Sequence, residues 1–336
     1  MVGDGRRWWV GGATGFLGSH LVRLLVSRGH SVVAVSRSGA PIDGLDSSAV
    51  EYRAADVLDA DAVAETARGC EGGFLSAGMV SRRPEDAEIL HRLHVAGTRS
   101  ALAGLSGAGV RRVVVASTSG TIAVSADPRR VVDEAAEPPL EIIHRWPYYR
   151  SKLYAEREAL DANRPPEFEV VVVNPSLLLG PGDLRGSSTG DIRLFLDRAI
   201  PAVPAGGVAF VDARDAAAGM LAAYERGRAG ERYLLNAKNI EVGALFERLE
   251  RLTGIAAPKL RLPRSIPVAS GAARLFERAV RALGGEPPVD PITVELGQYY
   301  WYCDSSKAER ELGWRARDPG ETLRETVEDL RSRALA

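Results

Sequence analysis

The stretch "WWVGGATGFLGSH", residues 8–20, decides the fold. Three glycines follow its apolar start at intervals of three residues: Gly12, Gly15 and Gly18. Residues 7–12 read as a β-strand and residues 16–28 as a helix, so the glycines occupy a strand-to-helix turn. Glycines with this spacing in that context predict a turn that binds a dinucleotide.

Each glycine of the turn has a separate physical role. Gly12 permits the tight turn, Gly15 lets the backbone approach a pyrophosphate, and Gly18 lets helix and strand pack closely. The helix N-terminus supplies N–H groups and a partial positive charge for the phosphates. The predicted cofactor-binding turn comprises Gly12, Thr14, Gly15, Phe16, Leu17 and Gly18.

Length, composition, net charge and cysteine count limit the classes of protein to which the chain can belong. The 336 residues are 45% hydrophobic and 26% charged, which is ordinary for a soluble globular protein, and the net charge of −1 argues against nucleic acid as a partner. No apolar run approaches the ~18 residues of a membrane span. Cys70 and Cys303 alone build neither a disulfide framework nor a metal site, so we expect no metal and a cytoplasmic location.

Strand-like and helix-like stretches alternate through the first half of the chain. The further strands expected there are residues 31–36, 49–54, 72–78, 111–117 and 168–175. Several are continuous apolar runs, as in parallel strands covered on both faces. Helices are expected over 59–68, 84–107 and from Pro147 to just before Asn163. The alternation predicts an α/β fold with a Rossmann-type doubly wound parallel sheet.

The chain is expected to form two lobes. We assign residues 1–176 to an NADP-binding Rossmann domain, with 208–237 returning to it as a strand, a helix and a strand. Residues 177–207 and 238–336 form a smaller, mostly helical substrate lobe with the C-terminal helices. Open α/β sheets bind ligands over the carboxyl ends of their strands, so we place the substrate between the lobes.

The end of the second strand indicates the cofactor. An acidic residue there favours NAD, and an arginine accommodates the 2′-phosphate of NADP. The chain has Arg37, and no carboxylate follows until Asp43, so we predict NADPH/NADP, with NAD less favoured. A solvated surface arginine is the alternative. After the third strand, Asp56, next to Val57, either contacts the adenine or forms a plain turn.

The strongest chemical signal is "YYRSK", residues 148–152. Tyr148 and Lys152 are four apart on a predicted helix and share one face. A nearby ammonium favours phenolate and lowers the phenol pKa. Such a phenol gives a proton to a carbonyl oxygen as hydride reaches the carbon. A hydroxyl partner is expected after the fifth strand, where Ser117, Thr118, Ser119 and Thr121 all qualify.

The motifs together resemble those of the extended short-chain dehydrogenase/reductase superfamily, also called the NAD-dependent epimerase/dehydratase superfamily. "GGATGFLG", "HVAGT", "VVVASTSGT", "YYRSK", "VVNPS" and "GPGD" occur in its order over nearly the whole chain. Within it, the sequence is similar to dihydroflavonol-4-reductase-like proteins. "NPSLLLGPGD", "GERYLL" and "SSKAERELGW" also resemble the hopanoid-associated sugar epimerase group.

The resemblance implies roles for individual residues. It implies Tyr148 as acid/base, Lys152 as its helper and holder of the nicotinamide ribose, and Thr118 as the hydroxyl partner. Further cofactor contacts implied are Ala77, Gly78, Pro175 and Ser176. It also implies a possible homodimer.

Three departures bear on the reaction. His94 stands where the family often has Asn, a residue that orders the active-site backbone or a water. Val208 and Ala209 stand where nucleotide-sugar enzymes often have Arg-Asp, which counts against a sugar nucleotide. Ser119 and Gly120 follow the active-site Thr in place of acidic residues, which counts against dehydration.

We therefore expect an NADPH-dependent ketoreductase of a medium-sized, fairly apolar carbonyl or alcohol substrate. The alternatives are a sugar-nucleotide epimerase with tightly held NAD and a cofactor-binding sensor without turnover. The aromatic run 299–302 either lines the substrate cleft or belongs to the core.

Overall fold

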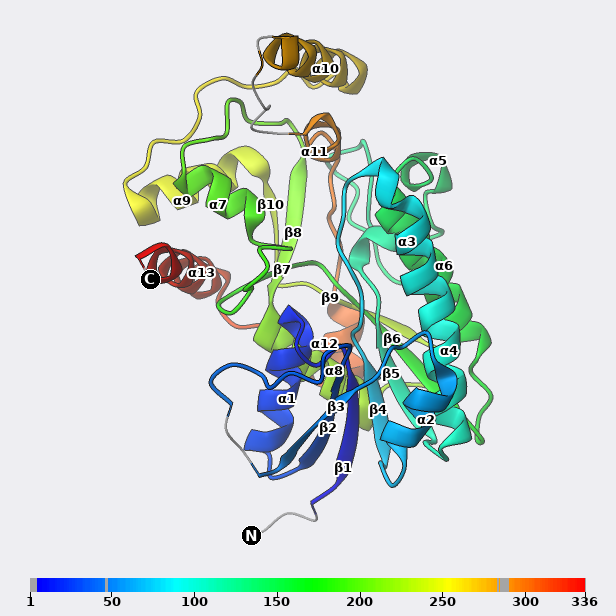
Figure 1. Cartoon of the computed structure of the whole chain (residues 1–336). Helices are drawn as coiled ribbons and strands as arrows, with labels where there is room; N and C mark the ends of the chain where they lie inside the picture. Colours follow the sequence, from blue (N-terminus) through cyan, green and yellow to red (C-terminus); the bar gives the residue numbers. More distant parts are fainter. Residues whose placement is uncertain (1–4, 46–47, 283, 285–289, 336) are drawn as a thin grey trace.

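The computed structural model describes residues 5–45, 48–282, 284 and 290–335. Seven parallel strands form the main sheet in the order β3-β2-β1-β4-β5-β6-β9 (Figure 1). Their bounds are β1 (Arg7–Gly11), β2 (Ser31–Ser36), β3 (Val50–Ala54), β4 (Gly72–Leu75), β5 (Arg112–Ala116), β6 (Glu169–Pro175) and β9 (Arg232–Leu235). The predicted Rossmann-type α/β fold is confirmed.

Helices cover both faces of this sheet, which explains the continuous apolar strands. On one face lie α1 (Phe16–Ser27), α8 (Ala213–Arg226) and α12 (Ser306–Leu312); on the other lie α2 (Ala60–Ala67), α4 (Gly97–Gly107) and α6 (Pro147–Asp161). Trp8 and Trp9 of β1 show the two faces directly. Trp8 packs with Leu21 and Met220 on one side, and Trp9 packs with Leu102 on the other.

The long helix predicted over residues 84–107 is interrupted. A 3₁₀ turn (η1, Pro84–Asp86) leads into α3 (Ala87–His91), and a π-helical segment (η2, Arg92–Ala96) then joins α3 to α4. Periodicity cannot show one extra residue in a turn. π segments of this kind occur frequently at functional sites, and His94 lies within this one.

The smaller lobe contains a sheet that the sequence analysis did not anticipate. β7 (Leu177–Leu179) pairs in parallel with β8 (Gly207–Asp212), and β10 (Lys238–Glu241) pairs with β8 in antiparallel. Helices α7 (Gly190–Leu196), α9 (Val242–Thr253) and α13 (Pro319–Leu335) pack around this sheet through a common apolar cluster. Two of the strands have only three or four residues, too few for a period-two pattern.

The stretch 208–237 is shared between the lobes. Its helix α8 covers the main sheet and its strand β9 extends that sheet beyond β6, whereas β8 belongs to the three-stranded sheet. At the far end of the smaller lobe lie α10 (Ile266–Ala282) and α11 (Pro291–Leu296) (Figure 1). No helix in the described part of the chain is long and apolar enough to cross a membrane.

Candidate active site

The glycine turn lies at the carboxyl end of β1, where strand order reverses between β2 and β4. Gly12 has a φ of 77°, and a Cβ there would lie 2.5 Å from the backbone nitrogen of Ala77. A Cβ on Gly18 would lie 2.2 Å from the carbonyl oxygen of Gly12. Neither position can carry a side chain, because each backbone is in close contact with another.

Gly15 is suited to contact a phosphate. It is the N-cap of α1, no side chain caps that helix, and its first turn contains no acidic residue. A Cβ on Gly15 would meet only the carbonyl oxygen of Gly12, at 3.1 Å. The outer side of the turn is therefore open, and the uncapped N–H groups of a 12-residue helix point there. This arrangement fits the pyrophosphate of a dinucleotide.

The other predicted residues of the turn have different environments. Thr14 is half-buried between the strand and the helix. The Phe16 ring packs edge-on to His20, with centroids 5.5 Å apart. Leu17 is buried in the core beside Leu21, so only its backbone N–H can reach a cofactor.

Arg37 and Asp56 follow β2 and β3. Arg37 is exposed, and among the described residues none forms an ion pair with its guanidinium. Asp56 accepts a hydrogen bond from the backbone N–H of Leu58 at 3.0 Å, so it has the turn-forming role that was one of its two alternatives. Val57 is buried and faces Gly97, where a Cβ would lie 3.2 Å from a Val57 methyl group.

The remaining predicted cofactor residues lie at the carboxyl ends of β4 and β6. Ala77 and Gly78 follow β4 beside the glycine turn, and Pro175 ends β6. Ser176 is buried, and its hydroxyl lies 3.3 Å from the carbonyl oxygen of Leu235. These four positions therefore border the same edge of the sheet as the glycine turn.

Tyr148 and Lys152 lie one turn apart near the start of α6. The Lys152 ammonium is buried and donates to the carbonyl oxygen of Ala116, the last residue of β5, at 2.7 Å. The Tyr148 ring is half-buried, edge-on to His94 at 5.8 Å and to Tyr149 at 5.1 Å between centroids. Helix α6 therefore brings a phenol and an ammonium to the end of the central strands.

The expected lowering of the Tyr148 pKa is wrong for this structure. Burial, with a smaller effect of Tyr149, raises the pKa of the Tyr148 phenol. Burial also lowers the pKa of Lys152 to about 8, against an opposing effect of the Glu156 carboxylate. The ammonium is directed to the Ala116 carbonyl, so desolvation dominates at the phenol.

The structure separates the four hydroxyl candidates after β5. Ser117 and Thr121 are buried and donate to the Glu156 carboxylate, at 2.6 and 3.0 Å. Ser119 is buried too and hydrogen-bonds the Cys303 thiol. Thr118 is half-buried and caps η3 (Ser119–Thr121), where its hydroxyl oxygen accepts from the N–H of Gly120 at 3.3 Å. Its proton remains available for another acceptor.

Glu156 is the main residue that the sequence analysis missed. It is 2% exposed, and each of its partners donates to its carboxylate: Ser117, Thr121, Asn174 at 2.7 Å and Arg232 at 3.1 Å. Ser117 directly follows β5, and the other three partners belong to η3, β6 and β9. One signal was available, because Tyr148, Lys152 and Glu156 are spaced by four and share one helix face.

His94 connects the segment after β4 to α6. Its Nε2 accepts from the backbone N–H of Met79 at 3.1 Å, and its Nδ1 lies 2.8 Å from the Ser151 hydroxyl. The Ser151 hydroxyl donates in turn to the carbonyl oxygen of Tyr148 at 2.8 Å. Burial, with a further effect of the Lys152 ammonium, lowers the pKa of His94 to about 3. The neutral imidazole therefore joins Met79 to Ser151 by hydrogen bonds and so fixes the helical turn that carries Tyr148.

Tyr149 connects Tyr148 to a cluster of aromatic rings. Tyr149 stacks on Trp301 with centroids 4.7 Å apart, and Trp146 packs against the same cluster. Of the aromatic run 299–302, Tyr299 and Tyr300 are buried, so these two rings belong to the core.

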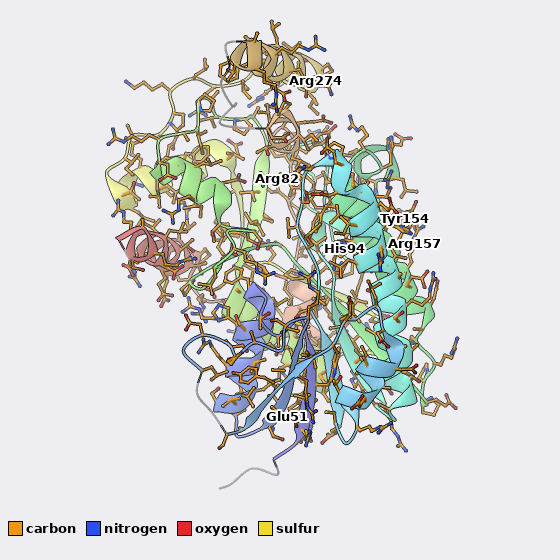
Figure 2. All side chains as sticks on the ribbon, in the orientation of Figure 1. Glu51, Arg82, His94, Tyr154, Arg157 and Arg274 are labelled. Carbon is orange, nitrogen blue, oxygen red and sulfur yellow. The ribbon has the colours of Figure 1, made fainter. Side chains whose placement is uncertain are left out.

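Arg82 connects the two lobes beside this cluster. It follows β4 and forms a bidentate pair with Asp191 of α7 at 3.1 and 2.9 Å, and it donates to Thr293 of α11 at 2.9 Å. Figure 2 shows Arg82 between the lobes, above His94. Among the described residues, no group of three His, Cys, Asp or Glu could hold a metal ion.

Comparisons with known proteins agree on one family. Residues 8–236 match the profile described as the NAD dependent epimerase/dehydratase family. A putative dihydroflavonol 4-reductase of Synechocystis sp. is 37% identical over 311 residues, covering 91% of this chain and 89% of the relative.

Two further matches cover almost the full chain. The 4-hydroxy-2-methyl-3-oxo-4-farnesyl-3,4-dihydroquinoline-1-oxide ketoreductase of Stigmatella aurantiaca is 31% identical, covering 93% of this chain and 92% of the relative. The crystal structure of gox2253 superposes with a TM-score of 0.81 at 28% identity, covering 98% and 99% of the two chains.

Proposed function

The chain belongs to the NAD dependent epimerase/dehydratase family, and from this premise we propose that it is an NADPH-dependent reductase of a carbonyl group in a medium-sized, fairly apolar molecule. Its broader class is NAD(P)-dependent oxidoreductase, because the family match is joined by relatives named as reductases. The cofactor preference, the substrate and the roles of single residues are the proposal.

One observation carries the proposal. The buried Lys152 ammonium bonds the last carbonyl of β5, two residues before the Thr118 hydroxyl and one helical turn after Tyr148. The segments that carry a phenol, an ammonium and a free hydroxyl proton thus border the edge of the sheet that also carries the glycine turn. This is the set of groups that reduction of a carbonyl needs.

Each residue has a defined task in the proposed reaction. A bound nicotinamide cofactor supplies the hydride for the carbonyl carbon. Tyr148 donates its proton to the carbonyl oxygen, and its raised pKa keeps the phenol protonated until that step. Lys152, cationic below a pKa of about 8, stabilises the phenolate that remains. Thr118 donates a hydrogen bond to the same carbonyl oxygen.

The surroundings support an apolar substrate and NADPH. Tyr149 and Trp301 present aromatic surface beside Tyr148. In β8, Val208 and Ala209 stand where charged residues would be needed to bind a sugar nucleotide. Two relatives are named for a dihydroflavonol and a farnesylated quinoline ketone. The exposed Arg37 supports a 2′-phosphate, because its guanidinium is a permanent cation with a planar donor set.

The Tyr148→Phe variant tests the proposal. Loss of the phenolic proton should lower kcat/KM for NADPH-dependent carbonyl reduction by about 10²–10⁴-fold, with NADPH affinity unchanged. The assay follows NADPH absorbance with a panel of flavonoid-like, terpenoid-like and simple aromatic ketones and aldehydes.

Tyr154→Phe is the matched control. Tyr154 lies on the same helix but is 39% exposed, so its substitution should leave kcat/KM within about twofold. Full activity of Tyr148→Phe would contradict the proposed acid. Stoichiometric tightly held NAD in the purified protein, without NADPH oxidation on any carbonyl, would favour an epimerase instead.

A further inference from the structure

Helix α10 exposes an apolar face at the end of the smaller lobe. It packs on α11, far from the main sheet (Figure 1). Val268, Leu275 and Phe276 are 58%, 70% and 48% exposed, and Leu260 in the preceding segment is 63% exposed. Large apolar side chains gathered on one exposed face mark an interaction surface.

The apolar face is bordered by a row of arginines. At 100° per residue, Val268, Ala272, Leu275 and Ala279 share the outward face of α10. Arg274, Arg278 and Arg281 project from the neighbouring face, and the one acidic residue of the helix, Glu277, pairs with Arg281 at 3.0 Å. For Arg274 and Arg278, the described residues offer no ion pair.

We propose that α10 docks on an anionic lipid bilayer, lying in the plane of the membrane surface. A helix with Leu and Phe on one face and arginines on the next buries its apolar side among acyl chains and places its cations at the headgroups. Charge complementarity selects this occupant over a second copy of the chain. Two copies joined through this face would bring their arginine rows together.

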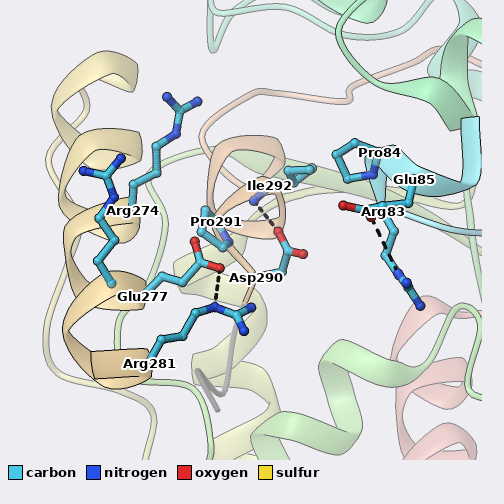
Figure 3. Close-up of a pocket in the computed structure, with 10 residues that line it drawn as sticks. Arg83, Pro84, Glu85, Arg274, Glu277, Arg281, Asp290, Pro291 and Ile292 are labelled. Atoms are coloured by element: carbon cyan, nitrogen blue, oxygen red, sulfur yellow. Dashed lines mark hydrogen bonds and ion pairs between the residues drawn. The ribbon is translucent and has the colours of Figure 1, made fainter. Parts of the chain in front are cut away.

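The opposite, inner side of α10 contacts the apolar cluster beside Tyr148. Ile266, the first residue of α10, and Ile292 of α11 pack in the same cluster as Tyr149 and Trp301. Figure 3 shows Glu277 and Arg281 of α10 extending toward Pro291 of α11, whereas Arg274 extends away from it; these residues line a cavity of about 620 Å³. Docking through α10 therefore places this side of the lobe, next to the candidate active site, at the membrane surface.

Vesicle sedimentation tests the proposal without reference to catalysis. The full chain should bind vesicles of equimolar phosphatidylcholine and phosphatidylglycerol, bind phosphatidylcholine alone much less, and lose binding at high salt. Leu275→Glu with Phe276→Glu should lower the partition coefficient at least about tenfold. Arg274→Gln with Arg278→Gln should lower it roughly fivefold per arginine on anionic vesicles only.

Matched controls use exposed residues on other elements. Ile89→Glu with Leu252→Glu replaces side chains that are 52% and 41% exposed, and Arg251→Gln with Arg324→Gln removes two exposed arginines. Both control variants should bind anionic vesicles as the unaltered chain does. Equal loss in the controls and in the α10 variants would overturn the proposal.

A direct probe covers the case in which an α10 variant folds poorly. A Phe276→Cys variant, labelled with an environment-sensitive fluorophore, should shift to the blue on anionic vesicles, and a labelled Leu252→Cys variant should not. An unshifted Phe276→Cys label would overturn the proposal. So would a concentration-dependent dimer without lipid that Leu275→Glu with Phe276→Glu abolishes, because the occupant would then be a second copy.

Discussion

Helices α6 and α10 place their side chains in opposite ways. α6 turns Ser151, Lys152 and Glu156 into the protein, and each is less than 10% exposed. α10 turns Leu275 and Phe276 outward. Charged residues are almost never fully buried unless paired, and a large exposed apolar face is equally unusual, so both helices depart from the ordinary pattern.

The difference lies in the partners. Every buried polar group of α6 named above has a hydrogen-bonding partner from another element: Ser151 has His94, Lys152 has the Ala116 carbonyl, and Glu156 has four donors. The outward face of α10 has no such partners among the described residues. The buried polar groups of α6 are therefore satisfied by other elements of the chain, whereas the described residues leave the outward face of α10 uncovered.

Among the substitutions considered, removal of the Glu156 carboxylate from α6 should lower the free energy of unfolding most. Glu156→Ala leaves Arg232 and the Asn174 amide without their shared acceptor, at a cost of about 3 kcal/mol in the free energy of unfolding. Urea denaturation checks this value.

Glu158→Ala is the control on the same helix. Glu158 pairs with the exposed Arg99. Glu158→Ala should therefore lower the free energy of unfolding much less than Glu156→Ala does. Equal losses for the two variants would show that α6 does not depend on its buried carboxylate.

Acidic pH should lower the stability of the folded chain, because His94, which packs against α6, becomes protonated. The pKa of His94 is about 3 in the folded chain and near 6.5 when unfolded, so the unfolded state binds more protons between these values. The stability due to neutral His94 is therefore complete above pH 6.5 and is lost as pH falls toward 3. We expect a loss of about 2 kcal/mol by pH 5.

His94→Asn isolates this effect. Asn does not titrate and retains one acceptor for Met79 and one donor for Ser151. The difference in unfolding free energy between pH 7 and pH 5 should therefore shrink in the variant. An unchanged pH dependence would assign the acid sensitivity to other groups.

The sequence predicts those parts of the fold that depend on local patterns. The glycine turn, the parallel strands and the Tyr148–Lys152 spacing all arise within a few residues, where periodicity and turn chemistry apply. The small sheet was missed because β7 and β10 are too short to show a pattern.

The supporting contacts of the site were not predictable in the same way. Glu156 meets Ser117 across 39 residues and Arg232 across 76, and Arg82 meets Asp191 across 109. Tertiary packing determines which of these residues meet. It also determines how far a side chain is removed from water, so the direction of the shift in the Tyr148 pKa was predicted wrongly.

Substitution of Arg37 gives the smallest and most selective effect. It tests whether an exposed charge that forms no ion pair with the described residues binds a ligand, as we propose for the arginines of α10. Arg37→Ser should raise the Kd for NADPH about tenfold and leave the Kd for NADH within about twofold, since only NADPH carries the 2′-phosphate. Arg28→Ser, at the end of α1, removes another exposed arginine from the opposite edge of the sheet and should change neither value. A parallel weakening of both cofactors by Arg37→Ser would instead mean that this side chain acts on the shape of the turn after β2, and an exposed arginine here would then carry no information about the ligand.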